Sequence, residues 1–526
     1  MGKRILLSCL ALLCGSAFGE YVNVSKLEAY IDTFNKQDNG LYQQYVSNAD
    51  SLDFLSKNIP MFECPDAEIE SVYYFRWWTF RKHIRKTPEG FVITEFLQNV
   101  RWAGKYNAIS CPAAMHFREG RWLADKSFLN SYARYWKNYE KLMRRYSFWA
   151  ADSILEFHKV SPNPELLKEM YPVLCGNFSE WEKGYRPDSN GLFWQTDNAD
   201  GMECSISGAL AEKGKGYRAT INSYMYGDAF ALSKIANILG DEQGENVYQK
   251  KAEVLKNLIN QKLWDNDANF YKVIPFGSQN FSDVRELHGY TPWYFNIAPA
   301  QYSQAWKQLS DTGGFRAPYG PTTAEQRHEK FAISYEGHEC LWNGPSWPYA
   351  TSITLVALGN LLNDYPATDA ADKSLFFDTL QTFAMSHHRI CDDGKRIFWI
   401  DENINPYNGE WISRIRLETS KDTAWVKSKG GKWRGDYYNH SEFCDIVITC
   451  LVGLRPSLDD MLVVNPLVPE SWDWFCLENI SYKGHKITVL FDKHGLKYNR
   501  GKGFKVYVDG TQKGAAKTLQ KISIKL

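Results

Sequence analysis

The segment SITLVALGNLL, from Ser352 to Leu362, has helical periodicity and is apolar on nearly every side. The segment from Asp445 to Leu454 has the same character. A helix that is apolar all round is buried on most of its sides, so other helices must cover it. Apolar residues recur at three- and four-residue steps across residues 127–455, and Gly, Asp, Asn or Pro marks most helix ends. The pattern predicts a mainly α-helical domain with an inner ring of helices inside an outer one.

The helices predicted from this periodicity span residues 67–82, 127–137, 140–158, 164–182, 221–239, 244–263, 298–309, 348–362, 370–388 and 440–454. A weak internal repeat connects them. Three times a helix leads into a polar turn and a short aromatic strand, at residues 188–194, 265–271 and 392–399. Helical hairpins that repeat in this way can close on themselves, so residues 61–456 are predicted to form a toroid.

Other segments flank or interrupt the predicted toroid. Residues 20–60 form an N-terminal lead-in with two amphipathic helical stretches, and residues 89–97 form a short strand in a long loop. After Arg455-Pro456 the sequence becomes β-rich, with glycines between short runs at residues 480–482, 486–491, 496–498, 505–508 and 522–526. Residues 457–526 are therefore predicted to form a small β-domain packed on the helices.

The first 19 residues have the features of a signal peptide. Lys3-Arg4 is followed by a short apolar stretch and by the small-x-small site Ala17-Phe18-Gly19. We expect export to the periplasm or the exterior, with lipid attachment at Cys9 less favoured because few apolar residues precede it. No later segment has the length of a membrane helix. Nine of the 11 cysteines follow the signal peptide, without a Cys-x-x-Cys pair, so no zinc site is expected.

Composition narrows the class of function. Lys+Arg and Asp+Glu both number 61, and this balance argues against a nucleic-acid partner, which would need a basic surplus. Aromatic residues reach 15% and include 19 Trp, many of them beside Gly, Asp or Asn. Part of this aromatic content must form the core. The rest suggests flat surfaces on which sugar rings stack, and hence an oligosaccharide or glycoside as substrate.

Two acidic segments point to the chemistry. They are DNADGMECS, from Asp197 to Ser205, and DENINPYNGEW, from Asp401 to Trp411, and each follows a short aromatic run. Glycoside hydrolysis generally uses two carboxyl groups that face each other across the scissile bond. One acts as a general acid and must stay protonated, so its pKa must be raised by burial. The other is expected to be a solvated carboxylate of ordinary pKa.

Several segments resemble one group of enzymes. NSYMYGDAFA from Asn222, WNGPSW from Trp342 to Trp347, and the two acidic segments are similar to motifs of six-hairpin glycosidases, the glucosidase, trehalase and mannosylglycerate-hydrolase group. The resemblance covers roughly residues 60–455 and implies an (α/α)6 toroid with an inverting mechanism. It implies Glu203 as general acid and Glu402 as general base, and an α-linked terminal glucose or mannose as substrate.

The sequence departs from the family pattern at both positions. The family has Asp where this chain has Glu203, which leaves Asp200 and Asp197 as alternative acids. Glu402 is followed by Asn-Ile rather than Tyr-Asn, which leaves Glu410 as an alternative base. Long loops at residues 89–125, 275–345 and 405–439 are predicted to wall off one end of the toroid. A pocket of this kind favours exo action.

Further residues are candidates for substrate binding, although core packing or ordinary hydrogen bonding explains each of them equally well. They are the stacking residues Trp194, Trp293, Trp342, Trp347 and Trp399, the polar residues Glu336, His338, Glu339 and Asn343, and the cation Arg76.

Two rival functions and one ion site stay open. Tyr438, Asn439 and His440 are the residue types that some toroidal lyases use on uronic acids, although side chains contiguous in sequence diverge. A glycan-binding protein without turnover is the other rival. No cofactor is expected, but the alternating oxygen donors Asp265, Asn266, Asp267 and Asn269 allow a structural calcium ion as the alternative to a plain turn.

Overall fold

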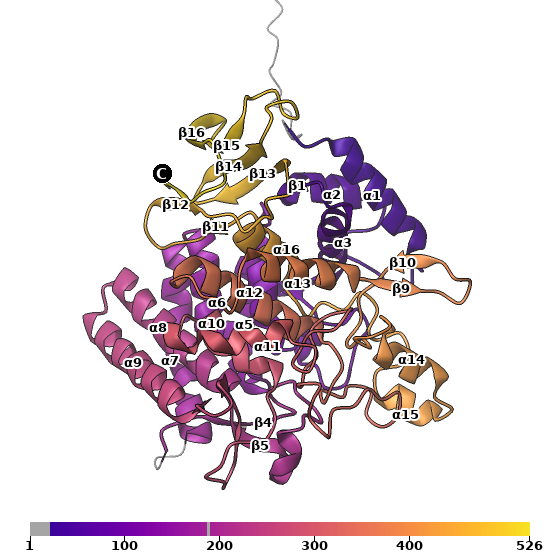
Figure 1. The fold of residues 1–526 in the computed structure, drawn as a ribbon, viewed down its shortest axis with the longest axis vertical. Coiled ribbons are helices and arrows are strands. Elements are labelled where there is room, and N and C mark those ends of the chain that lie inside the picture. The colour runs from indigo at the N-terminus through magenta and orange to yellow at the C-terminus, as the bar shows by residue number, and fades with distance from the viewer. Residues whose placement is uncertain (1–20, 187–189) are drawn as a thin grey trace, which may run out of the picture.

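The computed structural model describes residues 21–186 and 190–526 (Figure 1). The predicted signal peptide, residues 1–19, and the first two residues of the turn at 188–194 lie outside the described residues. The two helices of the predicted lead-in are present as α1 (Val24–Gln37) and α2 (Ser51–Asn58). Both pack on α3 (Ala67–His83), which is buried continuously from Ile69 to His83.

An inner ring of helices closes on itself. In this ring each helix packs on the next and the last packs on the first. The ring consists of α4 (Ala113–Gly120), α6 (Ala150–Val160), α8 (Ala219–Leu239), α10 (Thr291–Tyr294), α12 (Pro348–Asp364) and α16 (Phe443–Ile446), which continues as a π-helical segment at Val447–Leu451. In α12 every residue from Pro348 to Leu361 is buried, as its all-apolar sequence predicts. The (α/α)6 toroid predicted from the sequence is confirmed.

An outer layer covers this ring. It consists of α3, α5 (Ser127–Asn138), α7 (Pro164–Tyr185), α9 (Glu242–Lys262), the 3-10 segment Ala300–Trp306 with α11 (Lys307–Ser310), and α13 (Lys373–Met385). Figure 1 shows α7, α8 and α9 side by side. In α9 only Ala252, Leu255 and Ile259 are buried, because the rest of that helix faces solvent.

The helix predicted at residues 140–158 begins later than expected. A 3-10 turn occupies Glu140–Arg144, and α6 begins only at Ala150. The reason is a long-range cap: Asp228 of α8 accepts hydrogen bonds from the backbone N–H groups of Ala151, at 2.8 Å, and Asp152, at 3.1 Å. A carboxylate that binds these free N–H groups fixes the start of the helix.

The predicted long loops contain helices. Inner helix α4 lies within residues 89–125, which also hold the 3-10 turn Lys105–Asn107. The segment 275–345 contains the 3-10 turn Leu287–Tyr290 and α10, and the segment 405–439 contains α14 (Ile412–Thr419) and α15 (Thr423–Ser428). These segments are therefore partly helical walls of the toroid rather than irregular loops.

The C-terminal β-rich region forms two sheets. The larger has the order β1-β13-β14-β15-β16 and is antiparallel throughout. Its strands are β1 (Met61–Glu63), β13 (Trp474–Tyr482), β14 (His485–Asp492), β15 (Gly503–Val508) and β16 (Thr511–Ala516), and the smaller sheet contains β11 (Leu454–Arg455), β12 (Met461–Val464) and β17 (Ile522–Lys525). Because β1 comes from the start of the chain, the sheet is attached to both ends of the barrel sequence.

The strand predicted at residues 496–498 is absent. Instead, the carboxylate of Asp492 accepts four backbone N–H groups, at 2.7 Å from Gly495, 3.3 Å from Leu496, 2.8 Å from Lys497 and 3.0 Å from Tyr498. These bonds hold the segment as a loop, so its backbone is not free to pair as a strand.

Short hairpins decorate the helices. They are β2 (Ile84–Thr87) with β3 (Gly90–Ile93), β4 (Trp194–Thr196) with β5 (Lys215–Tyr217) and β8 (Ile274–Pro275), β6 (Trp264–Asp265) with β7 (Phe270–Tyr271), and β9 (His388–Ile390) with β10 (Arg396–Phe398). In the proposed calcium loop, Asp265 accepts the N–H groups of Asp267, at 3.0 Å, and Ala268, at 3.1 Å, and pairs with Lys272 at 3.2 Å. The turn therefore uses this carboxylate for its own hydrogen bonds.

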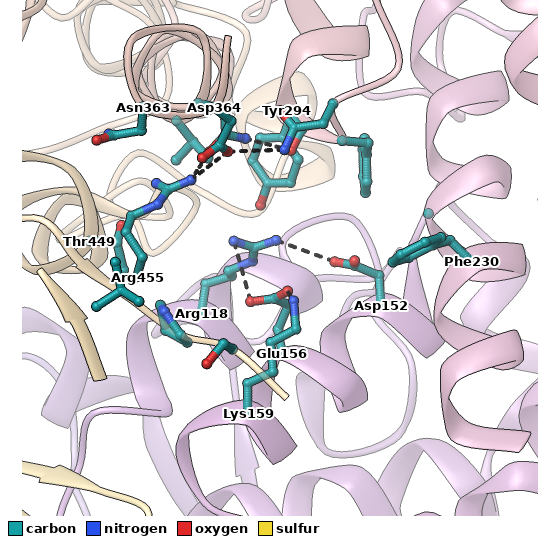
Figure 2. Close-up of a pocket in the computed structure, with 18 of the residues that line it drawn as sticks. Arg118, Asp152, Glu156, Lys159, Phe230, Tyr294, Asn363, Asp364, Thr449 and Arg455 are labelled. Carbon is teal, nitrogen blue, oxygen red and sulfur yellow. Dashed lines mark hydrogen bonds and ion pairs between the residues drawn. The ribbon is translucent and has the colours of Figure 1, made fainter. Parts of the chain in front are cut away.

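The interior of the barrel is charged as well as apolar. A cavity of about 350 Å³ lies at the end near the β-domain, lined by residues that include Arg118, Asp152, Glu156 and Arg455. Figure 2 shows Arg118 between Asp152 and Glu156, and Arg455 beside Asp364. Arg118 pairs with Asp152 at 3.3 Å and with Glu156 at 3.8 Å, and Arg455 pairs with Asp364 at 3.0 Å. The pairs of Arg118 connect inner helices α4 and α6. The pair of Arg455 connects the segment that leads into the β-domain to α12.

Within the described residues no two of the nine cysteines form a disulfide, and six of the nine are buried. Within residues 21–186 and 190–526, no helix is both long and apolar enough to cross a membrane.

Candidate active site

A second cavity, also of about 350 Å³, brings the two acidic segments together. Glu203 and Glu402 both line it, although they lie 199 positions apart in sequence. The other residues that matter for its chemistry are Glu95, His338, Glu339, Cys340, Trp342, Trp347, Lys429, Arg434, Tyr438 and His440. The cavity lies within the usual range for small-molecule sites, about 300–1,000 Å³, towards its lower end.

Glu203 is held by the loop that precedes it and by Trp342. Gly201 has a φ of +77° and lies against Trp347, where a Cβ atom would approach the indole Cη2 to 3.1 Å. A larger residue there would be strained and crowded, so glycine is required. The indole N–H of Trp342 donates to Glu203 Oε2 at 3.1 Å, and the Trp342 backbone N–H donates to the Glu203 carbonyl at 3.1 Å. The side chain is therefore fixed in the cavity wall.

The pKa of Glu203 suits a general acid. Burial is the main cause that raises this pKa to about 7, with the charges of Glu402 and Asp197 adding to the effect and the Trp342 hydrogen bond opposing it. A carboxyl group that must be protonated at neutral pH needs such a shift.

Glu402 has a cationic partner that Glu203 lacks. The Glu402 Oε2 atom accepts hydrogen bonds from Arg434 Nη2 and from the Cys340 thiol, the latter at 3.2 Å. Both bonds go to Oε2, and no described residue donates a hydrogen bond to Oε1. Oε1 is thus the atom available to a water molecule or a substrate hydroxyl.

The environment of Glu402 differs from the solvated one expected from the sequence. The side chain is buried, and this burial raises its pKa to about 7, with further increases from Glu339 and Asp401 and a decrease from Arg434. The expectation of an ordinary pKa was wrong because the sequence did not show how deeply the segment is packed. Burial raises both pKa values to about 7, so the two groups differ in their partners: Arg434 pairs with Glu402, whereas the indole of Trp342 donates to Glu203.

Arg434 organises the anionic side of the cavity. It pairs with Glu402 and, through Nη1, with Glu339 Oε1 at 2.9 Å. Lys429 pairs with the other oxygen of Glu339 at 3.0 Å. Burial disfavours the charged form of Glu339, but Arg434, His338 and Lys429 outweigh it and lower the pKa of that carboxyl. Sequence reasoning missed Arg434 and Lys429, which lie in a Gly-rich stretch without a recognised motif.

Aromatic rings form another wall. Trp342 and Trp347 stack with their ring centroids 4.2 Å apart, and Trp347 stacks on Tyr349 at 4.6 Å. Both Trp side chains of the WNGPSW segment line the cavity, and their role in substrate binding stays a prediction.

The alternative acids and base lie elsewhere. Asp200 is buried outside this cavity and contacts the Thr220 hydroxyl. Asp197 accepts the N–H of Asn198 at 2.8 Å and fills the space that a Cβ atom at Gly208 or Gly214 would need. Glu410 is exposed and accepts hydrogen bonds from Tyr335 and Asn408, at 2.5 and 2.8 Å. None of the three is among the residues that line the cavity of Glu203 and Glu402.

Only some of the predicted binding residues reach the cavity. Glu339 and His338 line it, whereas Glu336 is exposed and Asn343 is not among its lining residues. Arg76 is buried and bonds to Ser441 and His387, so it acts within the helical core.

The remaining tryptophans are packed against other side chains. Trp194 lies against Phe276 and Lys215, with its ring centroid 5.7 Å from that of Phe276. Trp399 lies against Arg414 and Tyr437. Trp293 is completely buried, and the ring of Trp306 lies 5.5 Å from it.

Tyr438 and His440 line the cavity together, whereas Asn439 turns away and donates to the Thr94 carbonyl at 3.2 Å. The Tyr438 hydroxyl contacts His440 Nδ1. The expectation that these neighbouring side chains diverge was therefore wrong for this pair.

A toroid of helical hairpins with two facing acidic segments and stacked indoles defines a class of carbohydrate-cleaving enzyme. The comparisons with known families agree. Residues 105–441 match the model of the mannosylglycerate hydrolase MGH1-like glycoside hydrolase domain, and residues 454–513 match the C-terminal domain of glycosyl hydrolase family 65. The chain belongs to the MGH1-like glycoside hydrolase family.

Solved structures show the same architecture. A protein described as a sialidase is 38% identical, with a TM-score of 0.87, over 96% of this chain. This chain covers 45% of that protein, which is thus more than twice the matched length. The GH63 mannosylglycerate hydrolase from Thermus thermophilus, solved with Tris, is 11% identical with a TM-score of 0.52, over 72% of this chain and 99% of its own. The GH78 rhamnosidase of Bacillus sp. GL1 is also 11% identical, with a TM-score of 0.53, over 82% of this chain and 40% of its own. The last two similarities concern the fold alone.

Proposed function

We propose that the chain hydrolyses a terminal, α-linked glycosidic bond with inversion, with Glu203 as general acid and Glu402 as general base. The observation that carries the proposal is the placement of these two carboxyl groups in one small cavity with stacked indoles. The sialidase name of the 38% identical protein describes a chain of which less than half is matched. That activity is therefore not carried over to this chain.

The proposed reaction balances within the cavity. Glu203 donates its proton to the leaving glycosidic oxygen while Glu402 accepts a proton from a water molecule through Oε1. That water attacks the anomeric carbon from the opposite face, which forms the new C–O bond as the old one breaks. Arg434 and Cys340 hold Oε2, so Glu402 is oriented as a base.

The pH dependence follows from the two raised pKa values. Glu402 must be a carboxylate, so kcat/KM is expected to fall as pH decreases below about 7. Glu203 must be protonated, so kcat/KM is expected to fall as pH increases above about 7. The product is a narrow bell-shaped profile around neutral pH. A plateau that extends far to the alkaline side would contradict the assignment of Glu203.

Arg434→Met gives a directional test of the base. The substitution removes the cation that lowers the pKa of Glu402, so this pKa is expected to increase. The acidic limb of the pH profile then moves to higher pH, while the alkaline limb, which belongs to Glu203, stays in place. Lys432→Met is the control, because Lys432 lies over Trp433 and contacts neither carboxylate. An unchanged acidic limb in Arg434→Met would exclude Glu402 as the group that titrates there.

The exo character and the linkage rest on the size of the cavity and on the resemblance to six-hairpin glycosidases. A cavity of about 350 Å³ suits a terminal sugar better than the interior of a long polysaccharide. The direct test is turnover of p-nitrophenyl α- and β-glycosides of glucose, mannose and rhamnose. Release from the α-series by wild type supports the proposal, and release from the β-series only contradicts the linkage.

Lyase chemistry is the second candidate because Tyr438 and His440 meet in the same cavity. A lyase would produce an unsaturated sugar that absorbs ultraviolet light when it is given a polyuronate. Absence of such absorbance, with free sugar released from glycosides, favours hydrolysis.

Export also remains a proposal, and mass spectrometry of the mature N-terminus after expression in the native host tests cleavage after Gly19.

A further inference from the structure

Glu95, Tyr438 and His440 form a cluster on the cavity wall that the two-carboxylate mechanism does not use. His440 Nδ1 lies 3.0 Å from Glu95 Oε1 and also contacts the Tyr438 hydroxyl. Both partners therefore meet the same ring nitrogen. The other nitrogen, Nε2, is buried and has no hydrogen-bond partner among the described residues.

An unpartnered ring nitrogen in a substrate cavity indicates a ligand contact. Buried polar atoms almost always have a partner, because losing water without a replacement destabilises the folded protein. His440 is only 3% exposed and lines the cavity. A ligand that enters the cavity would supply the missing hydrogen bond to Nε2.

The backbone around His440 is fixed before any ligand binds. Asn439 donates its backbone N–H to the Glu95 carbonyl at 3.1 Å, and its carbonyl lies 2.8 Å from His116 Nε2. The Asn439 side chain also donates to the Thr94 carbonyl. These contacts attach the segment to the residues that follow β3 on one side and to α4 on the other. A fixed segment loses little conformational freedom on binding.

The imidazole ring is equally constrained. It packs edge-on against Trp347 and Tyr349, with ring centroids 5.6 and 4.7 Å away. Trp347 belongs to the stacked indole wall. These contacts fix the orientation of the imidazole ring in the cavity wall.

A hydroxyl group fits Nε2 in either tautomer of the ring. In neutral imidazole one nitrogen donates and the other accepts. If Nδ1–H donates to Glu95, Nε2 accepts, and if Nδ1 accepts from Tyr438, Nε2–H donates. A hydroxyl both donates and accepts, whereas a carboxylate only accepts.

The charges of the cavity favour a neutral ligand. Its lining includes the carboxyl groups of Glu95, Glu203, Glu339 and Glu402, and its cations are Lys429 and Arg434. Both cations already contact carboxylates, Lys429 on Glu339 and Arg434 on Glu339 and Glu402. An anionic sugar placed at His440 would approach Glu95 without a free cation among the lining residues.

We propose that Glu95, Tyr438 and His440 form a subsite that binds one hydroxyl of a neutral sugar through His440 Nε2 and selects against sugar acids. The subsite deepens the proposed glycosidase function and rests on it, because it concerns the same cavity. It does not depend on the roles of Glu203 and Glu402 in turnover.

The test measures binding rather than catalysis. D-Glucose, D-mannose and D-glucuronate are titrated by ligand-observed NMR into the Glu402→Gln protein, into the same protein with His440→Phe, and into the same protein with His440→Gln. We expect at least one neutral sugar to bind, with D-glucuronate clearly weaker. His440→Phe is expected to weaken the neutral sugar about 3- to 10-fold, as for loss of one hydrogen bond, and His440→Gln to restore most of it. His494→Phe, at an exposed position of the β-domain, is the matched control.

The monodeoxy derivatives of the sugar that binds locate the contact. Removal of one particular hydroxyl from the sugar is expected to weaken binding to the protein that retains His440. The same deoxy sugar is expected to bind the His440→Phe variant as well as the parent sugar does, since the two changes remove the same hydrogen bond. Equal affinity of the His440 and Phe variants, tighter binding of D-glucuronate, or binding of neither neutral sugar overturns the proposal. Thermal unfolding of each variant separates these outcomes from misfolding. Loss of hydrolysis after changes at Glu203 or Glu402 does not bear on this result.

Discussion

Glu402→Gln is expected to lower kcat by about 10²- to 10⁴-fold, as for the loss of a general base. The amide keeps the size of the side chain and can still meet Cys340, but it cannot accept a proton from water. Glu203→Gln is expected to have an effect of the same order on substrates whose leaving group needs protonation. The rate is measured with a natural disaccharide, because an activated leaving group such as p-nitrophenolate would hide the loss of the acid.

Glu410→Gln is the matched control for the base. Glu410 lies in the same acidic segment but is exposed and bonds to Tyr335 and Asn408. We expect it to keep a rate close to wild type. If Glu410→Gln lost activity and Glu402→Gln kept it, the assignment of the base would be reversed. Asp200→Asn, at a residue that does not line the cavity, is the corresponding control for the acid.

Arg121→Met is expected to lower the free energy of unfolding by about 3–5 kcal/mol, the usual result of removing one partner of a buried ion pair. The Arg121 side chain is only 1% exposed and pairs with Glu156 at 2.6 Å and with Asp445 at 2.8 Å. Glu156 lies on α6 and Asp445 on α16, so one guanidinium ties two inner helices to the end of α4. Its removal leaves two buried carboxylates without this cation.

Equilibrium urea denaturation measures the loss. Arg134→Met is the control, because Arg134 pairs with Glu169 at 2.9 Å on the surface, where such a pair contributes about 0–1 kcal/mol. If Arg121→Met and Arg134→Met destabilised the protein equally, the buried ion pairs of Arg121 would not stabilise the barrel more than a surface pair does.

The buried helices that could be predicted from the sequence are those whose buried residues are apolar. Helix α12 was recognised because every side of it is hydrophobic, whereas α4 was missed and placed in a loop. Helix α4 is equally buried, but it carries His116, Arg118 and Glu119 into the charged interior, so its sequence lacks the apolar signature. Polar residues in a barrel interior are specified by partners far away in sequence, and a local pattern does not show them.

The candidate site divides in the same way. Glu203, Glu402 and the WNGPSW tryptophans were predicted from motifs and share one cavity, although their roles remain predictions. Arg434 was missed because its importance depends on contacts with Glu339 and Glu402, 95 and 32 positions away. Trp194 and Trp399 were predicted to bind substrate because each lies next to an acidic segment in the sequence. Each instead packs beside an Arg or Lys side chain and does not line the cavity. A residue that neighbours an acidic segment in the sequence therefore need not line the same cavity.

Proton NMR of the sugar released by wild-type protein, followed from the first seconds of turnover, tests the central proposal most directly. We expect that an α-glycoside first yields the β-anomer of the free sugar, and that the Glu402→Gln protein yields none. First appearance of the α-anomer would contradict the water-activating role of Glu402, because retention requires a covalent glycosyl-enzyme intermediate or an equivalent second displacement.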